Sequence, residues 1–365
     1  MQSRTGFYRD RRPSYAKALR QAHWPPLQEL KLCCLGLPEL QALARLRLPR
    51  LHSLELESAF GLKADHDAGH DYVGVDYNDE EDNSDDEDSG DDDDEEEGVA
   101  RRPLLGLQLL VRAPWFSQLA FLAIRTSQFP ADPGDLLGCQ APNLRALEID
   151  WCSFGQEGAA RLTQLQLPKL TALSITGRHL SKSGPFTMQS EGIAALLRGW
   201  ALEQLDTLCL RKLPIYHALT EALAGARLPK LRVLTIADTD FDVPSLTYIA
   251  EATWASQLRE LNLSLGSVDQ DGRYDDQTPA WRFFAAAPLN KLESLRLSGR
   301  RGTLPLLVLQ RLSNAAWFRH LHHLALPRLP ELTYDRLRKD APVLVELVEA
   351  GKGGARDWWA PRAVD

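Results

Sequence analysis

Leucine and isoleucine recur along this chain in a fixed six-residue pattern, L-x-x-L-x-[LI]. The pattern occurs ten times: LQELKL (27–32), LHSLEL (51–56), LAFLAI (119–124), LRALEI (144–149), LTALSI (170–175), LDTLCL (205–210), LRVLTI (231–236), LRELNL (258–263), LESLRL (292–297) and LHHLAL (321–326). In an extended strand the fourth and sixth positions face the same side, and the third and fifth face the other. We therefore expect ten short strands, each burying its fourth and sixth residues.

A helical pattern precedes many of these strands. Residues 103–124 and 305–326 align without a gap: both open with proline, and both reach tryptophan twelve residues later. Leucine spacings of three and four give these segments one apolar face, as in a helix packed on a sheet. The helices of five repeats close with a tryptophan, at Trp24, Trp115, Trp200, Trp254 and Trp317, whereas other repeats enter the strand through a proline. From residue 200 onward the two types alternate.

Helix-and-strand units of this length, repeated in this way, are typical of leucine-rich repeats. Over roughly residues 13–330 the chain resembles the ribonuclease-inhibitor-like family of such repeats. The resemblance implies an α/β solenoid, or horseshoe, of about ten repeats, with parallel strands on the concave face and helices on the convex face. It also implies a non-catalytic protein that binds other proteins through the concave face or a rim.

The longest interruption of the repeats is strongly acidic. Fifteen of the nineteen residues from 79 to 97 are Asp or Glu, and removing them takes the formal net charge from −8 to +7. Such a run cannot bury apolar surface, so we expect it to be disordered. Because the repeats continue on both sides, we interpret residues 60–100 as a loop inserted in the second repeat of one domain, residues 1–350. Residues 351–365 form a C-terminal tail.

The acidic loop and two shorter insertions, at 176–189 and 264–278, all follow the carboxyl ends of strands, so they emerge on one rim. Insertions gathered on one side of a repeat array often mark its binding side. An acidic run also attracts basic proteins, and repels nucleic acid. Ser84 and Ser89 are followed by acids three positions later, which makes them candidate phosphorylation sites.

The third and fifth positions of the strands predict the residues of a concave binding face. The central strands carry small, weakly polar residues there, and the ends carry charges. The candidate partner-binding residues are Glu29, Lys31, Glu55, Phe121, Glu148, Thr207, Glu260, Asn262, Arg296 and His323. This face has no aromatic series for stacking on bases and no basic stripe for phosphates, so we expect a protein partner and no nucleic acid.

Composition favours a reduced compartment. The five cysteines have no disulfide-framework or zinc-binding spacing. Residues 1–15 lack the apolar core of a secretion signal, and no window offers ~18 consecutive apolar residues, so we expect no membrane association. These features predict a location in the cytoplasm or nucleus, with cytoskeletal or axonemal association also open.

No motif predicts a cofactor, a metal or a catalytic residue. HLHH (320–323) offers two imidazoles without a third ligand, DHDAGHD (65–71) two more among carboxylates, and GKGG (351–354) lacks the spacing of a phosphate-binding loop. Two alternative functions stay open. One is the substrate-recognition subunit of an F-box-type ubiquitin ligase, although residues 1–12 contain no F-box. The other is a GTPase-activating regulator, a class that also joins such repeats to an acidic segment.

The segment after residue 326 departs from the repeat pattern. Leu344 and Leu347, three positions apart, predict a capping helix that seals the last repeat, as a solenoid requires.

Overall fold

The computed structural model describes most of the repeat array. The described residues are 16–21, 26–33, 35–57, 109–125, 141–150, 166–177, 190–199, 202–213, 217–241, 243–265, 279–299, 306–327 and 344–348.

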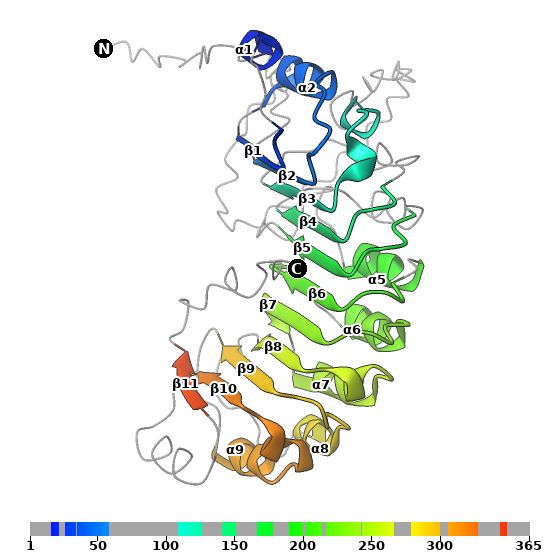
Figure 1. Cartoon of the computed structure of the whole chain (residues 1–365). Coiled ribbons are helices and arrows are strands. Elements are labelled where there is room, and N and C mark those ends of the chain that lie inside the picture. Colours follow the sequence, from blue (N-terminus) through cyan, green and yellow to red (C-terminus); the bar gives the residue numbers. More distant parts are fainter. Residues whose placement is uncertain are drawn as a thin grey trace, which may run out of the picture.

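Eleven parallel strands form a single curved sheet, and their order in the sheet is their order in the sequence (Figure 1). The strands are β1 (Glu29–Cys33), β2 (Ser53–Glu57), β3 (Phe121–Arg125), β4 (Ala146–Asp150), β5 (Ala172–Thr176), β6 (Thr207–Arg211), β7 (Val233–Phe241), β8 (Glu260–Leu265), β9 (Ser294–Gly299), β10 (His323–Pro327) and β11 (Leu344–Val348). β1 to β10 coincide with the ten predicted hexapeptides, so these strand predictions are confirmed.

The hexapeptides are in register with one another. Leu54 of β2 pairs with Leu122 of β3, and Leu56 pairs with Ile124, which aligns the fourth and sixth positions of neighbouring repeats. All four side chains are at most 2% exposed. The alternation in the sequence therefore produces continuous buried rows of leucine and isoleucine along one face of the sheet.

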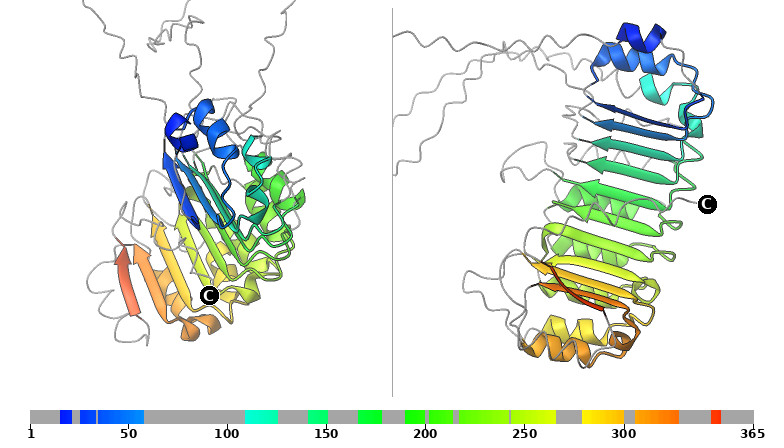
Figure 2. Two further views of the ribbon diagram at one scale, coloured as in Figure 1. Left: turned by 45° about the horizontal axis from the view of Figure 1, so that its top comes forward. Right: turned by 60° about the vertical axis from the view of Figure 1, so that its left-hand side comes forward.

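Helices cover that face. The described α-helices are α1 (Ala16–Gln21), α2 (Leu37–Ala44), α5 (Ser190–Gly199), α6 (His217–Gly225), α7 (Leu246–Glu251), α8 (Pro279–Ala286) and α9 (Leu306–Ser313). The 3-10 turns are η1 (Phe116–Gln118), η3 (Val243–Ser245), η4 (Ala255–Gln257) and η5 (Ala316–His320). Figure 2 shows the strands stacked along an arc with the helices behind them. The helices therefore form the convex layer.

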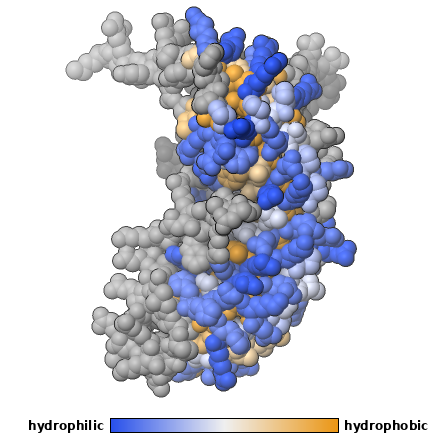
Figure 3. All heavy atoms as spheres, viewed as in Figure 1, coloured by the Kyte–Doolittle hydropathy of each residue, from blue (hydrophilic) through white to orange (hydrophobic). Residues whose placement is uncertain are grey.

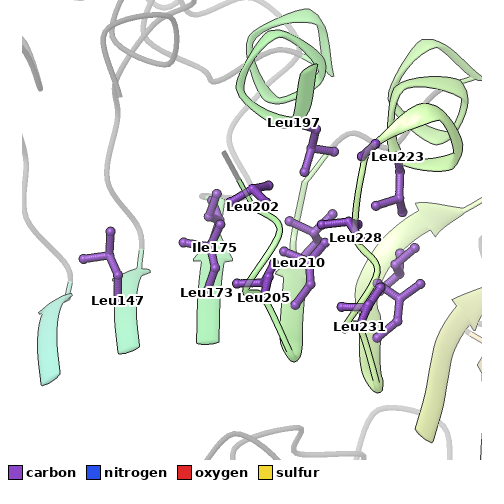
Figure 4. Packing of buried hydrophobic residues seen from close by; sticks show 14 of the residues in the cluster. Leu147, Leu173, Ile175, Leu197, Leu202, Leu205, Leu210, Leu223, Leu228 and Leu231 are labelled. Carbon is purple, nitrogen blue, oxygen red and sulfur yellow. The ribbon is translucent and has the colours of Figure 1, made fainter. Parts of the chain in front are cut away.

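The core lies between the two layers. Leu173 and Ile175 of β5 and Leu210 of β6 point from the sheet toward Leu197 of α5 and Leu223 of α6 (Figure 4). Trp115, Trp254 and Trp317, which precede β3, β8 and β10, are each at most 1% exposed. The indole N–H groups of Trp115 and Trp254 donate to backbone oxygens of the preceding repeat's helix, Leu43 at 3.3 Å and Leu223 at 3.0 Å. Trp24 and Trp200 lie outside the described residues.

Backbone hydrogen bonds clamp successive repeats together just before each strand. The oxygen of His52 accepts from the N–H groups of both Ala120 and Phe121, at 2.8 and 3.0 Å. The same paired arrangement recurs from repeat to repeat between β1 and β10. Each repeat is thereby fixed to its neighbour at the start of the strand. The connections that vary in length follow the carboxyl ends of the strands.

The predicted capping helix is wrong for residues 344–348. They form β11, which pairs in parallel with β10 and places Leu344 opposite His323, Val345 opposite Leu324 and Leu347 opposite Leu326. By this register the segment that corresponds to the hexapeptide is PVLVEL (342–347), which has Pro342 at the first position and Val345 at the fourth in place of leucine. The three-residue spacing of Leu344 and Leu347, which predicts a helix, occurs here in an eleventh strand.

One parallel sheet with strands in sequence order, backed by helices, confirms the predicted fold class. The fold is an α/β leucine-rich-repeat solenoid.

Candidate functional site

The concave face of the sheet presents three residues from each of the regular strands. In β4, for example, Ala146, Glu148 and Asp150 face outward, while Leu147 and Ile149 are buried in the core. We refer to the first, middle and third concave positions of a strand. The first two positions are those predicted from the hexapeptide, and the third is the residue immediately after it.

The middle position forms the floor of the concave face. Ser174, Cys209 and Thr235 are 3 to 4% exposed, and the predicted partner-binding residues Glu148 and Asn262 are each 7% exposed. Side chains at the ends of this row are more accessible: Lys31 is exposed, and Glu55 and Arg296 are half-buried.

The first position is the more accessible of the two predicted rows. Glu29 is exposed, and the other predicted residues of this row are half-buried: Phe121, Thr207, Glu260 and His323. A partner approaching the central strands would therefore contact the first position before the floor.

A network of ion pairs crosses the first four strands. The guanidinium of Arg125, at the third position of β3, donates to both carboxylate oxygens of Glu148 on β4, each at 2.8 Å. Its remaining terminal nitrogen donates to Glu55 on β2, also at 2.8 Å. On the other side of Glu55, the Lys31 ammonium lies 3.1 Å away and continues the network to β1. Two predicted residues of the floor are thus joined by a cation that was not predicted.

The third position adds further carboxylates at this end of the face. Glu57 lies 3.9 Å from the Lys31 ammonium and accepts from the Cys33 thiol at 3.7 Å. Asp150 follows on β4. We call the following seven residues the acidic patch, because five acids face two cations there: Glu29, Lys31, Glu55, Glu57, Arg125, Glu148 and Asp150.

The network changes the proton affinities of two groups. The hydrogen bond with Glu148 raises the pKa of Arg125 above its usual value, so the guanidinium stays charged. Burial is the largest cause that raises the pKa of Asp150 above 3.8, and the neighbouring Glu148 raises it further. Arg211, a hydrogen bond from Thr176 and Lys212 act in the opposite direction and only partly offset this rise.

The sequence interpretation missed the third position. Glu57, Arg125, Asp150, Thr176 and Arg211 each follow a hexapeptide directly, as in LAFLAI-R and LRALEI-D. The hexapeptide ends with a leucine or isoleucine, but the strand continues for one more residue. Continuing the alternation of buried and outward-facing residues past the sixth position predicts these five residues on the concave face.

Several predicted features lie outside the described residues. These are Ser84 and Ser89, the acidic run 79–97, most of the two shorter insertions, and the C-terminal tail.

The described surface offers little for catalysis or metal binding. His320 and His322 are exposed, and no three His, Cys, Asp or Glu residues of the described ranges are grouped closely enough to hold a metal ion. Hydrophilic residues make up most of the described surface in Figure 3. Within the described part of the chain, no helix has the length and apolar character needed to cross a bilayer.

No protein-family model and no curated protein matches this chain. Among solved structures, a leucine-rich-repeat protein of Leptospira interrogans is 17% identical, with a TM-score of 0.32 over 88% of this chain and 78% of its own. An internalin of Listeria monocytogenes is 13% identical, with a TM-score of 0.28 over 93% and 89%. A Bacteroides fragilis protein is 13% identical, with a TM-score of 0.33, and this chain spans 59% of its length with 66% of its own. The assignment of the fold rests on the repeat geometry described above.

Proposed function

We propose that this protein is a non-catalytic interaction module that binds a partner protein on the concave face. One observation supports this most directly: a preorganised row of ion-paired side chains, Lys31, Glu55, Arg125 and Glu148, continues into small polar residues on the central strands. Charged groups held in place at one end of the concave face can orient a bound partner, and the small residues of the central strands leave room for its side chains. The ribonuclease-inhibitor-like subtype, and a single repeat domain over residues 1–350, belong to the same proposal.

The charge of the acidic patch points to a basic segment on the partner. Arg125 and Lys31 are already engaged by carboxylates, and the patch has five acids against these two cations, an excess of three negative charges. The acidic run 79–97 follows β2 in the sequence, and β2 ends at Glu57 within the patch. Lysine or arginine side chains of the partner would be attracted by both.

A photo-crosslinking experiment tests the face used. Benzoylphenylalanine would replace Phe121, half-buried on the concave side of β3, or, as a matched control, Phe283, which is 50% exposed on α8 of the convex layer. We expect a defined partner to be crosslinked from position 121 and not from position 283. Crosslinking from 283 alone, or equally from both positions, would contradict the proposal.

A second arm tests the kind of partner. The chain lacking residues 79–97 should crosslink the same partner from position 121 more weakly, and more so at low ionic strength, where charge attraction reaches furthest. If the captured partner is acidic, the concave face still binds protein but the charge argument is wrong.

A further inference from the structure

The edge of the sheet where the strands begin carries an unusual amount of positive charge. We define the strand-start rim as the residues immediately before and after the first leucine of each hexapeptide from β2 to β10. These two positions hold seven Arg or Lys residues and two acids. The rim lies at the opposite end of the strands from the insertions and outside the concave floor, so it is a separate surface.

The rim cations are held in place by a repeated contact. The ammonium group of a lysine donates to the side-chain amide oxygen at the equivalent position of the preceding repeat: Lys169 to Asn143, Lys230 to Gln204 and Lys291 to Gln257, at 2.8, 2.5 and 2.9 Å. An amide oxygen orients a lysine without neutralising it. None of these three contacts brings a carboxylate to the lysine.

Two arginines of the rim are paired with carboxylates and add no net positive charge. Arg232 pairs with Asp206 at 3.4 Å, and Arg259 with Glu293 at 3.3 Å. Arg145, by contrast, is exposed and has no carboxylate partner among the described residues. Arg145 and Lys169, on the adjacent strands β4 and β5, are therefore two neighbouring rim cations without a carboxylate partner among the described residues.

These two cations line a hollow of about 350 Å³ at the start of β4, β5 and β6, together with Pro168, Thr171 and Gln204. The hollow contains two charged donors, a hydroxyl and an amide, and its described lining includes no acid. This donor set suits a carboxylate, because the guanidinium of Arg145, the ammonium of Lys169 and the amide nitrogen of Gln204 can each donate a hydrogen bond to its oxygens. The Thr171 hydroxyl donates to the Arg145 backbone oxygen.

We propose that the strand-start rim binds an acidic peptide segment of a second partner protein, with Arg145 and Lys169 holding a carboxylate in the hollow. Lys230 lies two strands beyond Lys169, roughly 10 Å along the rim. A peptide in the polyproline II conformation covers that distance in about three residues, which is one turn, so acids at every third position would face both lysines. The rim positions of β2–β10 contain no Phe, Tyr or Trp for base stacking, which favours a peptide over nucleic acid.

The occupant assigned here is a separate protein, and the experiment below also tests the chain's own acidic run, which follows β2 in the sequence. The rim is separate from the concave face, so an experiment can contradict binding at one surface without contradicting binding at the other.

Fluorescence anisotropy with a labelled deca-glutamate peptide tests the proposal on the full chain. The double variant R145E/K169E should weaken binding by about tenfold or more, since two attractions become repulsions. The control R198E/R282E makes the same charge change at exposed positions of α5 and α8, on the convex layer. It should keep the Kd within about twofold, and circular dichroism checks that both variants fold.

Three outcomes would overturn the inference. Equal weakening by both double variants would show only a general charge effect. Binding that appears only after removal of residues 79–97 would assign the rim to the chain's own acidic run. Tighter binding of a single-stranded oligonucleotide, with the same dependence on Arg145 and Lys169, would assign it to nucleic acid.

Discussion

Two tryptophans at equivalent places in the repeat differ in one hydrogen bond. Trp254 and Trp317 are both fully enclosed, at 1% and 0% exposure. The indole N–H of Trp254 donates to the Leu223 oxygen at 3.0 Å, whereas that of Trp317 has no hydrogen-bond acceptor among the described residues. Trp317 instead packs edge-on against Phe284, with ring centroids 5.7 Å apart. A buried donor without an acceptor costs about 1–3 kcal/mol.

Replacing each tryptophan with phenylalanine should separate the two cases. W254F loses a hydrogen bond as well as part of the ring, but W317F loses ring contacts and removes an unsatisfied donor. We expect W254F to lower the free energy of unfolding by about 1–3 kcal/mol more than W317F, measured by urea denaturation. Equal losses would indicate that the ring of Phe284 serves as the acceptor for Trp317.

Asp150 gives the acidic patch a pH dependence of known sign. Its pKa is raised in the folded protein, so the folded state binds its proton more tightly than the unfolded state does. Stability from this group is therefore highest below the unfolded value of 3.8, and is lost as the pH rises through the raised folded value. At neutral pH the carboxylate opposes folding.

The variant D150N should remove this penalty while keeping an oxygen for the Thr176 hydroxyl. We expect its Tm to exceed that of the unchanged protein by about 1–2 °C at pH 7. The difference should disappear below pH 3.8. A lower Tm at pH 7 would mean that attraction to Arg211 and Lys212 outweighs burial.

At the scale of elements, the end of β5 approaches the end of β6 more closely than a side chain allows. The N–H of Gly177 donates to the Arg211 oxygen at 2.8 Å. A Cβ atom on Gly177 would lie 2.4 Å from the oxygen of Lys212, which itself adopts a left-handed conformation with φ of 49°. The glycine is required here by contact with backbone, which cannot move aside as a flexible side chain would.

The variant G177A should lower the free energy of unfolding by about 1–3 kcal/mol, because a methyl group is forced against this backbone. Gly225, at the end of α6, is a matched control, since a Cβ there meets nothing within 4 Å. G225A should be neutral or stabilise by up to about 1 kcal/mol. Both values come from chemical denaturation, and a neutral G177A would show that β5 and β6 can separate at their ends.

Arg125 connects three strands, so its removal should have a larger effect than removal of an exposed arginine. R125A leaves Glu55 and the nearly buried Glu148, whose side chains are 27% and 10% exposed, without their shared cation. We expect a loss of about 1–3 kcal/mol. R232A breaks the exposed pair with Asp206 and should cost less than about 1 kcal/mol. Similar losses in the two variants would mean that the network adds nothing beyond surface charge.

At the scale of the whole molecule, the periodic leucines were sufficient to predict the sheet. The hexapeptide alone predicted β1 to β10, because apolar residues two positions apart are buried together when the segment is a strand with that side facing the core. The pattern did not predict β11, because Pro342 and Val345 stand where its first and fourth leucines would be. The Arg125 network could not be read from spacing, since it joins residues up to 70 positions apart in the chain, across an insertion of arbitrary length.

The alternation along the strand-start rim predicts which deletions the array tolerates. Removing residues 205–257 joins Gln204 to Leu258 and keeps the order Lys169, Gln204, Lys291. Removing residues 205–230 joins Gln204 to Leu231 and leaves Gln204 and Gln257 on adjacent strands. We expect the longer deletion to unfold cooperatively, and the shorter one to unfold at lower temperature, by calorimetry. The reverse ranking would show that the number of strands alone decides stability.

From Asn143 to Lys291, where each lysine meets an amide of the repeat before it, the natural unit of the array is a pair of repeats. Within that span, a single repeat copied or lost would set two like partners side by side, whereas a pair can be copied without disturbing any neighbour. A lineage that lengthens or shortens this solenoid in steps of two would leave its rim intact, and related chains should then differ by even numbers of repeats.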